Sequence, residues 1–166
     1  MRVGTKILVE KIVHRKKNLE RRYMIHLVDI DGSNWRVPLK VSKEQEQYVA
    51  NSTTILARAY AYRDSGSHAL LVYEDETPVG MVLYHGEESM GAYVFSELFI
   101  DEHFQGKGYG KAATKLVLEN MKKDGKYNRV ILCYIEGNDA AQKLYESFGF
   151  VETERDEEEV IMELRL

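Results

Sequence analysis

A glycine-rich loop followed at once by an amphipathic helix is the sequence feature that most constrains the fold of this chain. The loop is Gln105-Gly106-Lys107-Gly108-Tyr109-Gly110, and the residues before it, Tyr93 to Ile100, are predicted to form a strand. Lys111 to Lys123 predict a helix that Gly125 ends, with an inner stripe of Ala113, Leu116, Val117 and Met121. A strand that passes through glycines into a helix is typical of an α/β chain.

The loop has the composition of an anion site. Glycines allow backbone N–H groups to point into the turn, and the N-terminus of the following helix adds positive potential. Lys107 and Lys111 add charge, so a phosphate or pyrophosphate ligand is favoured over a plain surface turn. A P-loop needs four residues between its first glycine and a Gly-Lys-Ser/Thr sequence, but Lys111 is followed by Ala112. The G-x-G-x-G spacing also differs from the G-x-G-x-x-G of dinucleotide-binding folds.

The remaining sequence predicts alternating strands and helices, with no repeat and no linker that would divide it. Turn residues between apolar runs, as in Glu74 to Pro78, predict hairpins, and Ser42 to Gln45 resembles a capping box. The predicted strands are Met24–Ile30, Ala69–Tyr73, Val79–Tyr84, Val130–Ile135, Phe150–Thr153 and Val160–Leu164. The predicted helices are Trp35–Val41, a segment opening at Ser42, Thr53–Tyr62 with Ile55, Leu56, Ala59 and Tyr60 on one face, and Asn138 to about Phe148.

The composition limits the class of protein. With 166 residues, 44% of them hydrophobic, the chain fits one globular domain. No apolar run approaches the ~20 residues that a membrane helix needs, so no membrane partner is expected. Cys133 is the single cysteine, which excludes an internal disulfide and favours a cytoplasmic location. Its apolar strand predicts a core residue rather than a nucleophile. Five scattered histidines predict no metal site.

The charge is unevenly distributed along the chain. Residues 1–23 carry eight basic and two acidic side chains, whereas the rest of the chain carries 15 basic and 25 acidic ones. An acidic body attracts cations and repels nucleic acid. Amine substrates are therefore expected, and nucleic acid is not expected as a partner.

The basic segment of residues 1–23 has three interpretations. It fits a nucleic-acid-binding arm, an additional strand over Thr5 to Val13, or a sequence that does not belong to the native protein. The third is favoured because Glu20 to Met24 can be encoded as GAA-AGG-AGA-TAT-ATG, which contains a bacterial ribosome-binding site before a start codon. Residues 1–23 in a mass spectrum of the natively expressed protein would contradict it. Residues 24–166 are the expected folded domain.

A second motif lies in the predicted helix that Asn138 caps. Asn138, Ala141 and Tyr145 share one face of this helix, because they are three and seven residues apart. The small Ala141 allows a ligand to approach the helix, and Tyr145 presents a hydroxyl. The alternative is a capped helix with a packed tyrosine. Phe148-Gly149-Phe150 follows the motif.

Together the two motifs resemble the GNAT superfamily of acetyl-CoA-dependent N-acetyltransferases. The loop matches the family signature Q/R-x-x-G-x-G/A, and the later Asn-x-x-Ala-x-x-x-Tyr with a trailing Gly-Phe follows in the family's order. The resemblance covers Met24 to Leu166. It implies an α/β, three-layer fold: a mixed, mostly antiparallel sheet of six or seven strands flanked by helices. The fourth and fifth strands, here Tyr93–Ile100 and Val130–Ile135, would splay apart.

The resemblance also implies where acetyl-CoA, the cosubstrate, would bind. Its pantetheine arm would enter the splay and pair with the strand edge formed by Leu98, Phe99 and Ile100. Its pyrophosphate would lie on Gln105, Gly106, Lys107, Gly108, Tyr109 and Gly110, with Lys111 adding charge. Asn138, Ala141 and Lys143 would contact the cofactor from the other wall.

The implied reaction is direct attack by an amine on the thioester in a ternary complex. An alkylamine has a pKa of about 10, so a base must remove its proton before the attack. Tyr145 is expected to protonate the departing thiolate. Glu97, expected to share a strand face with Phe95 and Phe99, is the candidate base. Its competitors are Ser96, Asp101, Glu136 and an ordered water.

The acceptor expected from the resemblance is a polyamine such as spermidine or spermine. Several segments resemble the bacterial spermine/spermidine (diamine) N-acetyltransferase branch: Val37–Val41, Glu44–Gln45, Tyr48–Ser52, Ala57–Tyr62 and Phe99–Glu102. Ser96-Glu97 departs from the arginine or aspartate expected there. A protein N-terminal or lysine acetyltransferase and a non-catalytic acetyl-CoA-binding module are the alternatives. Dimers are common in the family, so a homodimer is also an expectation.

Overall fold

A seven-stranded sheet forms the centre of the computed structural model, which describes residues 24–166. The strand order is β1-β2-β3-β4-β5-β7-β6, and all neighbours are antiparallel except the parallel pair β4 and β5. The mostly antiparallel sheet expected from the sequence is confirmed. The interpretations of residues 1–23 lie outside the described residues. The strands are β1 (Ile25–Asp29), β2 (His68–Glu74), β3 (Thr77–Glu87), β4 (Ala92–Ile100), β5 (Arg129–Ile135), β6 (Val151–Asp156) and β7 (Glu159–Arg165).

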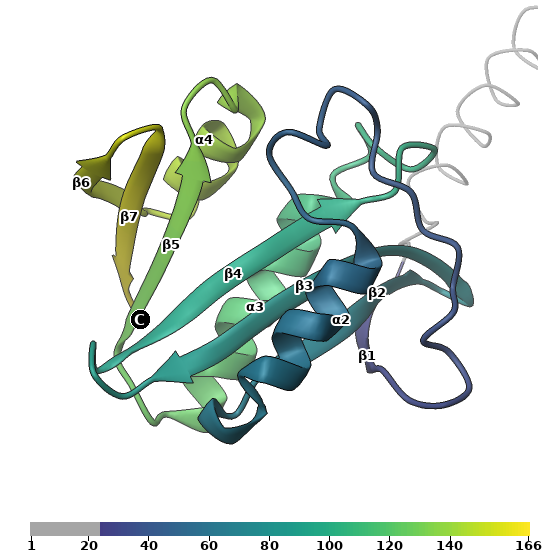
Figure 1. Cartoon of the computed structure of the whole chain (residues 1–166), viewed down its shortest axis with the longest axis horizontal. Helices are drawn as coiled ribbons and strands as arrows, with labels where there is room; N and C mark the ends of the chain where they lie inside the picture. Colours follow the sequence, from purple (N-terminus) through teal and green to yellow (C-terminus); the bar gives the residue numbers. More distant parts are fainter. Residues whose placement is uncertain (1–23) are drawn as a thin grey trace, which may run out of the picture.

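Helices cover both faces of the sheet and give the expected three layers. The helix α2 (Ser52–Ala61) lies on one face, and α3 (Tyr109–Asp124) lies on the other, as Figure 1 shows. Ile55 anchors the apolar cluster on the α2 side, and Val117 lies in the larger cluster on the α3 side. The short helix α4 (Asp139–Glu146) follows β5, and a 3-10 turn, η1 (Arg63–Ser65), follows α2. No helix within residues 24–166 is long and apolar enough to cross a membrane.

The strands β4 and β5 are paired only where both begin. Tyr93 pairs with Val130 and Val94 with Ile131, and beyond these two pairs the strands diverge (Figure 1). The expected splay of the fourth and fifth strands is confirmed. Among residues 24–166, the splay leaves the second half of β4 without a neighbouring strand on that side, between the glycine loop and α4.

The predicted helix over Trp35–Val41 and the helix predicted to open at Ser42 are both wrong. The first segment turns early, because Asp31 accepts a hydrogen bond from Ser33 N–H (2.7 Å) and donates its own N–H to the Asn34 side chain (2.9 Å). Pro38 then offers no N–H to continue a helix. The second segment forms only turns, closed by bonds such as Glu46 N–H to Ser42 O (3.0 Å). These turns place residues 42–50 beside the splay.

The inner face predicted for α2 is only partly correct. Ile55 is fully buried there, but Tyr60 is 70% exposed. The two residues are five positions apart, about 140° around a helix, so they face different directions. The Arg63 guanidinium covers the outward-facing Tyr60 ring at 4.3 Å from its centroid.

Candidate functional site

A cleft of about 420 Å³ opens between the second half of β4, the glycine loop and α4. Twelve of the predicted site residues line it: Leu98, Phe99, Ile100, Gln105, Gly106, Gly108, Tyr109, Gly110, Lys111, Asn138, Ala141 and Tyr145. Sequence reasoning missed the rest of the lining, which is Gln45, Val49, Phe104, Ala140 and Leu144. The predicted Lys107 and Lys143 are exposed and do not line the cleft.

The edge of β4 directs backbone groups into the cleft. Asp101 N–H donates to Val79 O (2.9 Å), which fixes the alternation of the antiparallel ladder between β3 and β4. The backbone groups of Phe99 then face β3, and those of Leu98 and Ile100 face the splay. An extended ligand could therefore form strand-like hydrogen bonds with Leu98 and Ile100. Phe99 is not placed to do so, because its backbone N–H and C=O face β3. Its side chain lies in the core on the α2 side.

The Gln105 side chain braces the loop against two other segments. Its Nε2 donates to Ile100 O at the end of β4 (3.0 Å) and to Gln45 Oε1 in the turns before α2 (2.5 Å). The sequence motif identified Gln105 but not its partner Gln45, which is 60 residues away.

The glycine loop has the backbone geometry that an anion site needs. Gly106 (φ +74°) and Gly108 (φ +83°) are in the left-handed region, where a side chain would be strained. The carbonyl of Gly108 accepts from Ala112 N–H (3.1 Å), and the N–H groups of Gly110 and Lys111 precede that first intrahelical bond. Such first-turn N–H groups have no intrahelical acceptor and point out of the helix end. With the helix dipole they form a cradle for a phosphate group.

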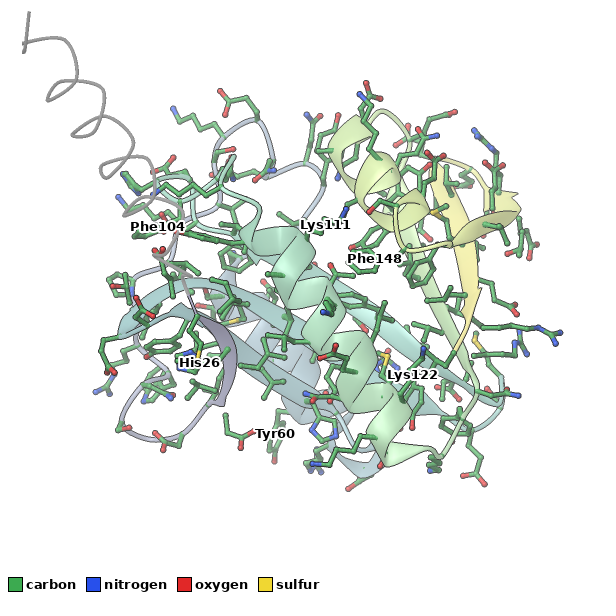
Figure 2. The ribbon with its side chains drawn as sticks, turned by 180° about the vertical axis from the view of Figure 1, so that it is seen from behind. His26, Tyr60, Phe104, Lys111, Lys122 and Phe148 are labelled. Atoms are coloured by element: carbon green, nitrogen blue, oxygen red, sulfur yellow. The ribbon has the colours of Figure 1, made fainter. Side chains whose placement is uncertain are left out.

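Two lysines add positive charge near this cradle. Lys111 lines the cleft, and its Nζ lies 5.9 Å from the centroid of the Phe148 ring (Figure 2). Lys107 does not line the cleft, but its Nζ lies 5.1 Å from the ring centroid of Phe104, which does. Lys111 is thus placed to contact an anion inside the cleft, and Lys107 contributes charge from its rim.

The cap of α4 and two aromatic contacts place Tyr145 at the splay. Asn138 Oδ1 accepts from Ala141 N–H (3.2 Å), which fixes the first turn of α4 as expected. Two turns later, the Tyr145 ring meets Phe95 and Phe150 edge to face, with centroids 6.0 and 5.7 Å away. The expected ligand-facing tyrosine therefore lines the cleft and is also packed against the core.

The environment of Tyr145 keeps its phenol protonated. The side chain is almost fully buried, and this burial raises the pKa of the phenol well above its usual value. Glu97 and Cys133 raise that pKa further, because a phenolate would be repelled by a carboxylate and by a thiolate. The phenol therefore carries its proton at neutral pH, and the raised pKa also makes it a weaker acid than an ordinary tyrosine.

Glu97 shares a strand face with Phe99 but not with Phe95. The register of β3 and β4 shifts so that Ser96 is an extra residue in β4, a bulge that reverses the alternation of side chains. Phe95 consequently lies in the core on the α3 side, and Phe99 in the core on the α2 side. The expectation that Glu97 shares a strand face with both rings is correct for Phe99 and wrong for Phe95.

The Glu97 carboxylate is buried against an arginine that sequence reasoning missed. Its Oε1 forms an ion pair with Arg58 Nη1 from α2, and its Oε2 accepts from Ala50 N–H (3.3 Å). Burial raises the pKa of Glu97 above its usual value, although both partners oppose the shift. A carboxylate in an apolar strand needs a cation. Arg58 follows the buried Ile55 by three residues, so helical spacing places it on the same side of α2.

Cys133 is exposed, so its assignment to the core is wrong. Its neighbours Leu132 and Tyr134 are buried on the α3 side of β5, and Cys133 therefore faces the other side. There α2 packs mainly on β2 and β3. Packing around the thiol and the nearby Glu159 still raise its pKa.

Two competitors of Glu97 for the role of base are held in other contacts. Asp101 accepts the N–H of Lys40 (2.7 Å) and both the N–H and Nδ1 of His103 (3.0 and 2.9 Å), as expected for a turn residue. Glu136 pairs with Arg155 (2.5 Å) on the surface. Among residues 24–166 there is no group of three or more His, Cys, Asp or Glu that could hold a metal ion.

The profile of the Acetyltransferase (GNAT) family matches residues 24–150. The chain belongs to this family. It is 32% identical over 121 residues to the spermine/spermidine N(1)-acetyltransferase of Bacillus subtilis (strain 168), covering 68% of this chain and 76% of the relative. The probable spermine N(1)-acetyltransferase of Bacillus subtilis subsp. natto (strain BEST195) matches with the same identity and coverage. The resemblance stated from the two motifs is thereby confirmed.

Solved structures agree with the GNAT fold. The PaiA N-acetyltransferase from Thermoplasma acidophilum in complex with coenzyme A superposes with a TM-score of 0.66 at 16% identity, covering 86% of this chain and 99% of that one. The spermidine N-acetyltransferase SpeG chimera from Vibrio cholerae and hSSAT gives 0.66 at 17% identity, covering 85% and 94%. At such identities the likeness shows the fold alone.

The GNAT cleft has two walls that fit an acyl-CoA. One wall offers the open backbone edge of Leu98 and Ile100, and the loop beside it offers N–H groups at a helix N-terminus. The other wall is α4, where the small side chain of Ala141 leaves space. Tyr145 comes from this second wall and lines the cleft, whereas Glu97 is not among the lining residues and lies on the α2 side of β4 with Phe99. The family match identifies the chain as an N-acetyltransferase.

Proposed function

We propose that this GNAT protein transfers an acetyl group from acetyl-CoA to a primary amine of a small molecule, and that this amine belongs to a polyamine such as spermidine or spermine. The observation that carries the proposal is the splay itself. The splay leaves the edge of β4 at Leu98 open, and the protonated Tyr145 lines the cleft there. Glu97 lies on the α2 side of the same part of β4. The single cysteine fits a reducing compartment, and we place the reaction in the cytoplasm.

The cosubstrate would be held by groups that the cleft already presents. The N–H groups of Gly110 and Lys111 would bind the pyrophosphate, and Leu98 and Ile100 would bind the pantetheine arm through their backbones. Acetyl-CoA supplies the thioester that the amine attacks. A backbone N–H of β4 that faces the splay would stabilise the oxyanion that forms.

The two proton steps are assigned to Glu97 and Tyr145. An alkylammonium with a pKa of about 10 must lose a proton before it can attack, and Glu97 would accept this proton directly or through a water. Tyr145 would donate its proton to the leaving thiolate, whose conjugate thiol has a pKa of about 8.5. Tyr145 lines the cleft, and Glu97 lies near enough to raise the pKa of its phenol.

Two observations support a polyamine over other amines. The relatives that match this chain at 32% identity are named spermine or spermidine acetyltransferases. The chain beyond residue 23 also carries 25 acidic and 15 basic side chains, and such a surface attracts polycations.

The test is release of free thiol from acetyl-CoA with spermidine, spermine, putrescine and a lysine peptide in parallel. Tyr145→Phe is compared with wild type, and Tyr73→Phe on β2, outside the cleft, is the matched control. Turnover of polyamines that falls only in Tyr145→Phe is the expected result. Turnover of the peptide alone would indicate a protein acetyltransferase. Coenzyme A binding without turnover of any acceptor would contradict the proposed reaction.

A further inference from the structure

The ion pair of Arg58 with Glu97 joins α2 to β4 at the splay. The side chain of Glu97 is 8% exposed, whereas that of Arg58 is 50% exposed, so the carboxylate is enclosed and the guanidinium reaches solvent. The second carboxylate oxygen accepts Ala50 N–H (3.3 Å) at the end of the turns before α2. One carboxylate thus connects β4 to both segments that cover this face beside the splay.

Arg58 is the one cationic side chain paired with Glu97 within residues 24–166. Two other titratable groups interact electrostatically with Glu97 across the splay: Tyr145 from α4 and Cys133 from β5. The pKa of each is raised, so both are neutral at neutral pH. From β3, the residue opposite Glu97 is the apolar Leu83. The charge of the carboxylate is therefore balanced by one residue, which cannot lose its proton in a protein.

This balance decides which form Glu97 adopts. A buried carboxylate without a cation takes up a proton, because burial disfavours its charged form. Burial already raises the pKa of Glu97, and Arg58 opposes that shift. Since a carboxylic acid cannot accept a proton from an ammonium, a base at this position depends on its arginine.

We propose that Arg58 is a positioning residue for acetyl transfer: it fixes the Glu97 carboxylate at the splay and keeps it in the ionised form that accepts the proton of the amine. The inference rests on the proposed function. Arg58 does not line the cleft, and in this proposal it acts through Glu97.

The experiment compares the pH profile of kcat/KM for Arg58→Gln, Arg58→Lys and wild type with one polyamine. The titration of the polyamine is the same for all variants, so a difference between their pH profiles reflects an ionisable group of the enzyme. In Arg58→Gln the acidic limb is expected to move up by about one pH unit or more, with activity partly recovered at high pH. Arg58→Lys should keep the wild-type limb with a lower kcat. Arg63 is a neighbouring arginine outside the pair, and Arg63→Gln is the matched control. This variant should change neither the position of the acidic limb nor kcat.

A loss of activity in Arg58→Gln that is the same at every pH would overturn the proposal, because it would indicate a merely structural role. If Arg58→Gln does not fold, Arg58→Lys remains decisive. A kcat/KM profile of Arg58→Lys whose acidic limb is displaced from the wild-type position would also overturn the proposal. Carboxyl-detected NMR titration of Glu97, assigned with Glu97→Gln, needs no turnover and should show its pKa rise in Arg58→Gln. An unchanged titration contradicts the inference, whereas an inactive wild type with the expected titration contradicts only the proposed function.

Discussion

Tyr145 meets Phe95 edge to face, with ring centroids 6.0 Å apart and planes inclined by 69°, and this contact joins α4 to β4 beside the splay. The ring and the hydroxyl of Tyr145 therefore have separable roles. The ring packs against the core, and the hydroxyl is the group that our proposal uses. Tyr145→Phe keeps the ring and removes only the hydroxyl.

We expect Tyr145→Phe to fold and to bind acetyl-CoA like wild type, while kcat falls by about 10²–10⁴, the usual contribution of a positioned acid. Calorimetric binding, thermal unfolding and thiol release measure the three quantities. A large drop in Tm together with weaker binding would instead mean that the hydroxyl serves the fold.

The left-handed backbone of Gly108 predicts the effect of Gly108→Ala. No atom of the described part of the chain lies within 4 Å of an added Cβ, so the change introduces no clash there, only strain at φ +83°. Left-handed backbone costs a non-glycine residue about 1–2 kcal/mol. We expect a lower Tm and weaker acetyl-CoA binding, since the cradle at the start of α3 must relax. Gly32→Ala is the control, because Gly32 also has open space around it but no positive φ.

The turn before the loop depends on the ionised form of Asp101. Burial by itself would raise the pKa of Asp101, but hydrogen bonds from Lys40 N–H and from His103 outweigh it and hold the pKa below its usual value. A depressed pKa in the folded state means that the stabilisation is present above the unfolded pKa of about 3.9 and is lost as the pH falls through the folded value.

Asp101→Asn should therefore lower the free energy of unfolding by about 1–3 kcal/mol at pH 7, since the amide offers one acceptor oxygen to donors that the two carboxylate oxygens serve in wild type. The difference from wild type should narrow towards pH 3. Urea unfolding at the two pH values measures this, with the exposed turn residue Glu76→Gln as a control. A difference that is constant with pH would contradict the role of ionisation.

The strand, glycine loop and helix over residues 93–124 were predictable because their signals are local. Alternation, left-handed glycines and a helical stripe each depend on residues a few positions apart. The two site motifs were found for the same reason, and twelve of the predicted site residues line one cleft. The partner of Gln105 was not found, because Gln45 is far away in sequence and nothing local marks it.

The errors come from features that a local pattern does not contain. A bulge at Ser96 adds one residue to β4. Regular alternation of side chains predicts that Phe95 and Glu97 share a face, but the bulge places them on opposite faces of the sheet. Cys133 lies in an apolar run, which predicts a strand buried on both faces. Burial of the face that carries Cys133 would need a helix packed on that side of β5, and only the tertiary structure reveals where the helices pack. Arg58 was missed because its partner Glu97 is 39 residues away in the sequence, and no periodic pattern marks such a pair.

The exposed thiol of Cys133 provides a last prediction about the α2 side of the splay. Cys133 is the single cysteine of the chain, so a maleimide labels one position. Its pKa is raised by the packing around it, then by Glu159 and by Glu97. The reactive thiolate should therefore form only well above neutral pH, and labelling should be slow at pH 7 and faster at pH 9.

Labelling of Cys133 should block acetyl transfer, because the bulky adduct would occupy the side of the splay from which the amine approaches Glu97. A saturating polyamine should slow the labelling. Cys133→Ser should remain active and resist the maleimide, since no step in the proposed reaction uses the thiol. Thiol loss and residual activity are followed on the same samples. Labelled wild-type protein that keeps full activity would place the acceptor elsewhere, and an inactive Cys133→Ser would give the thiol a role in the reaction itself.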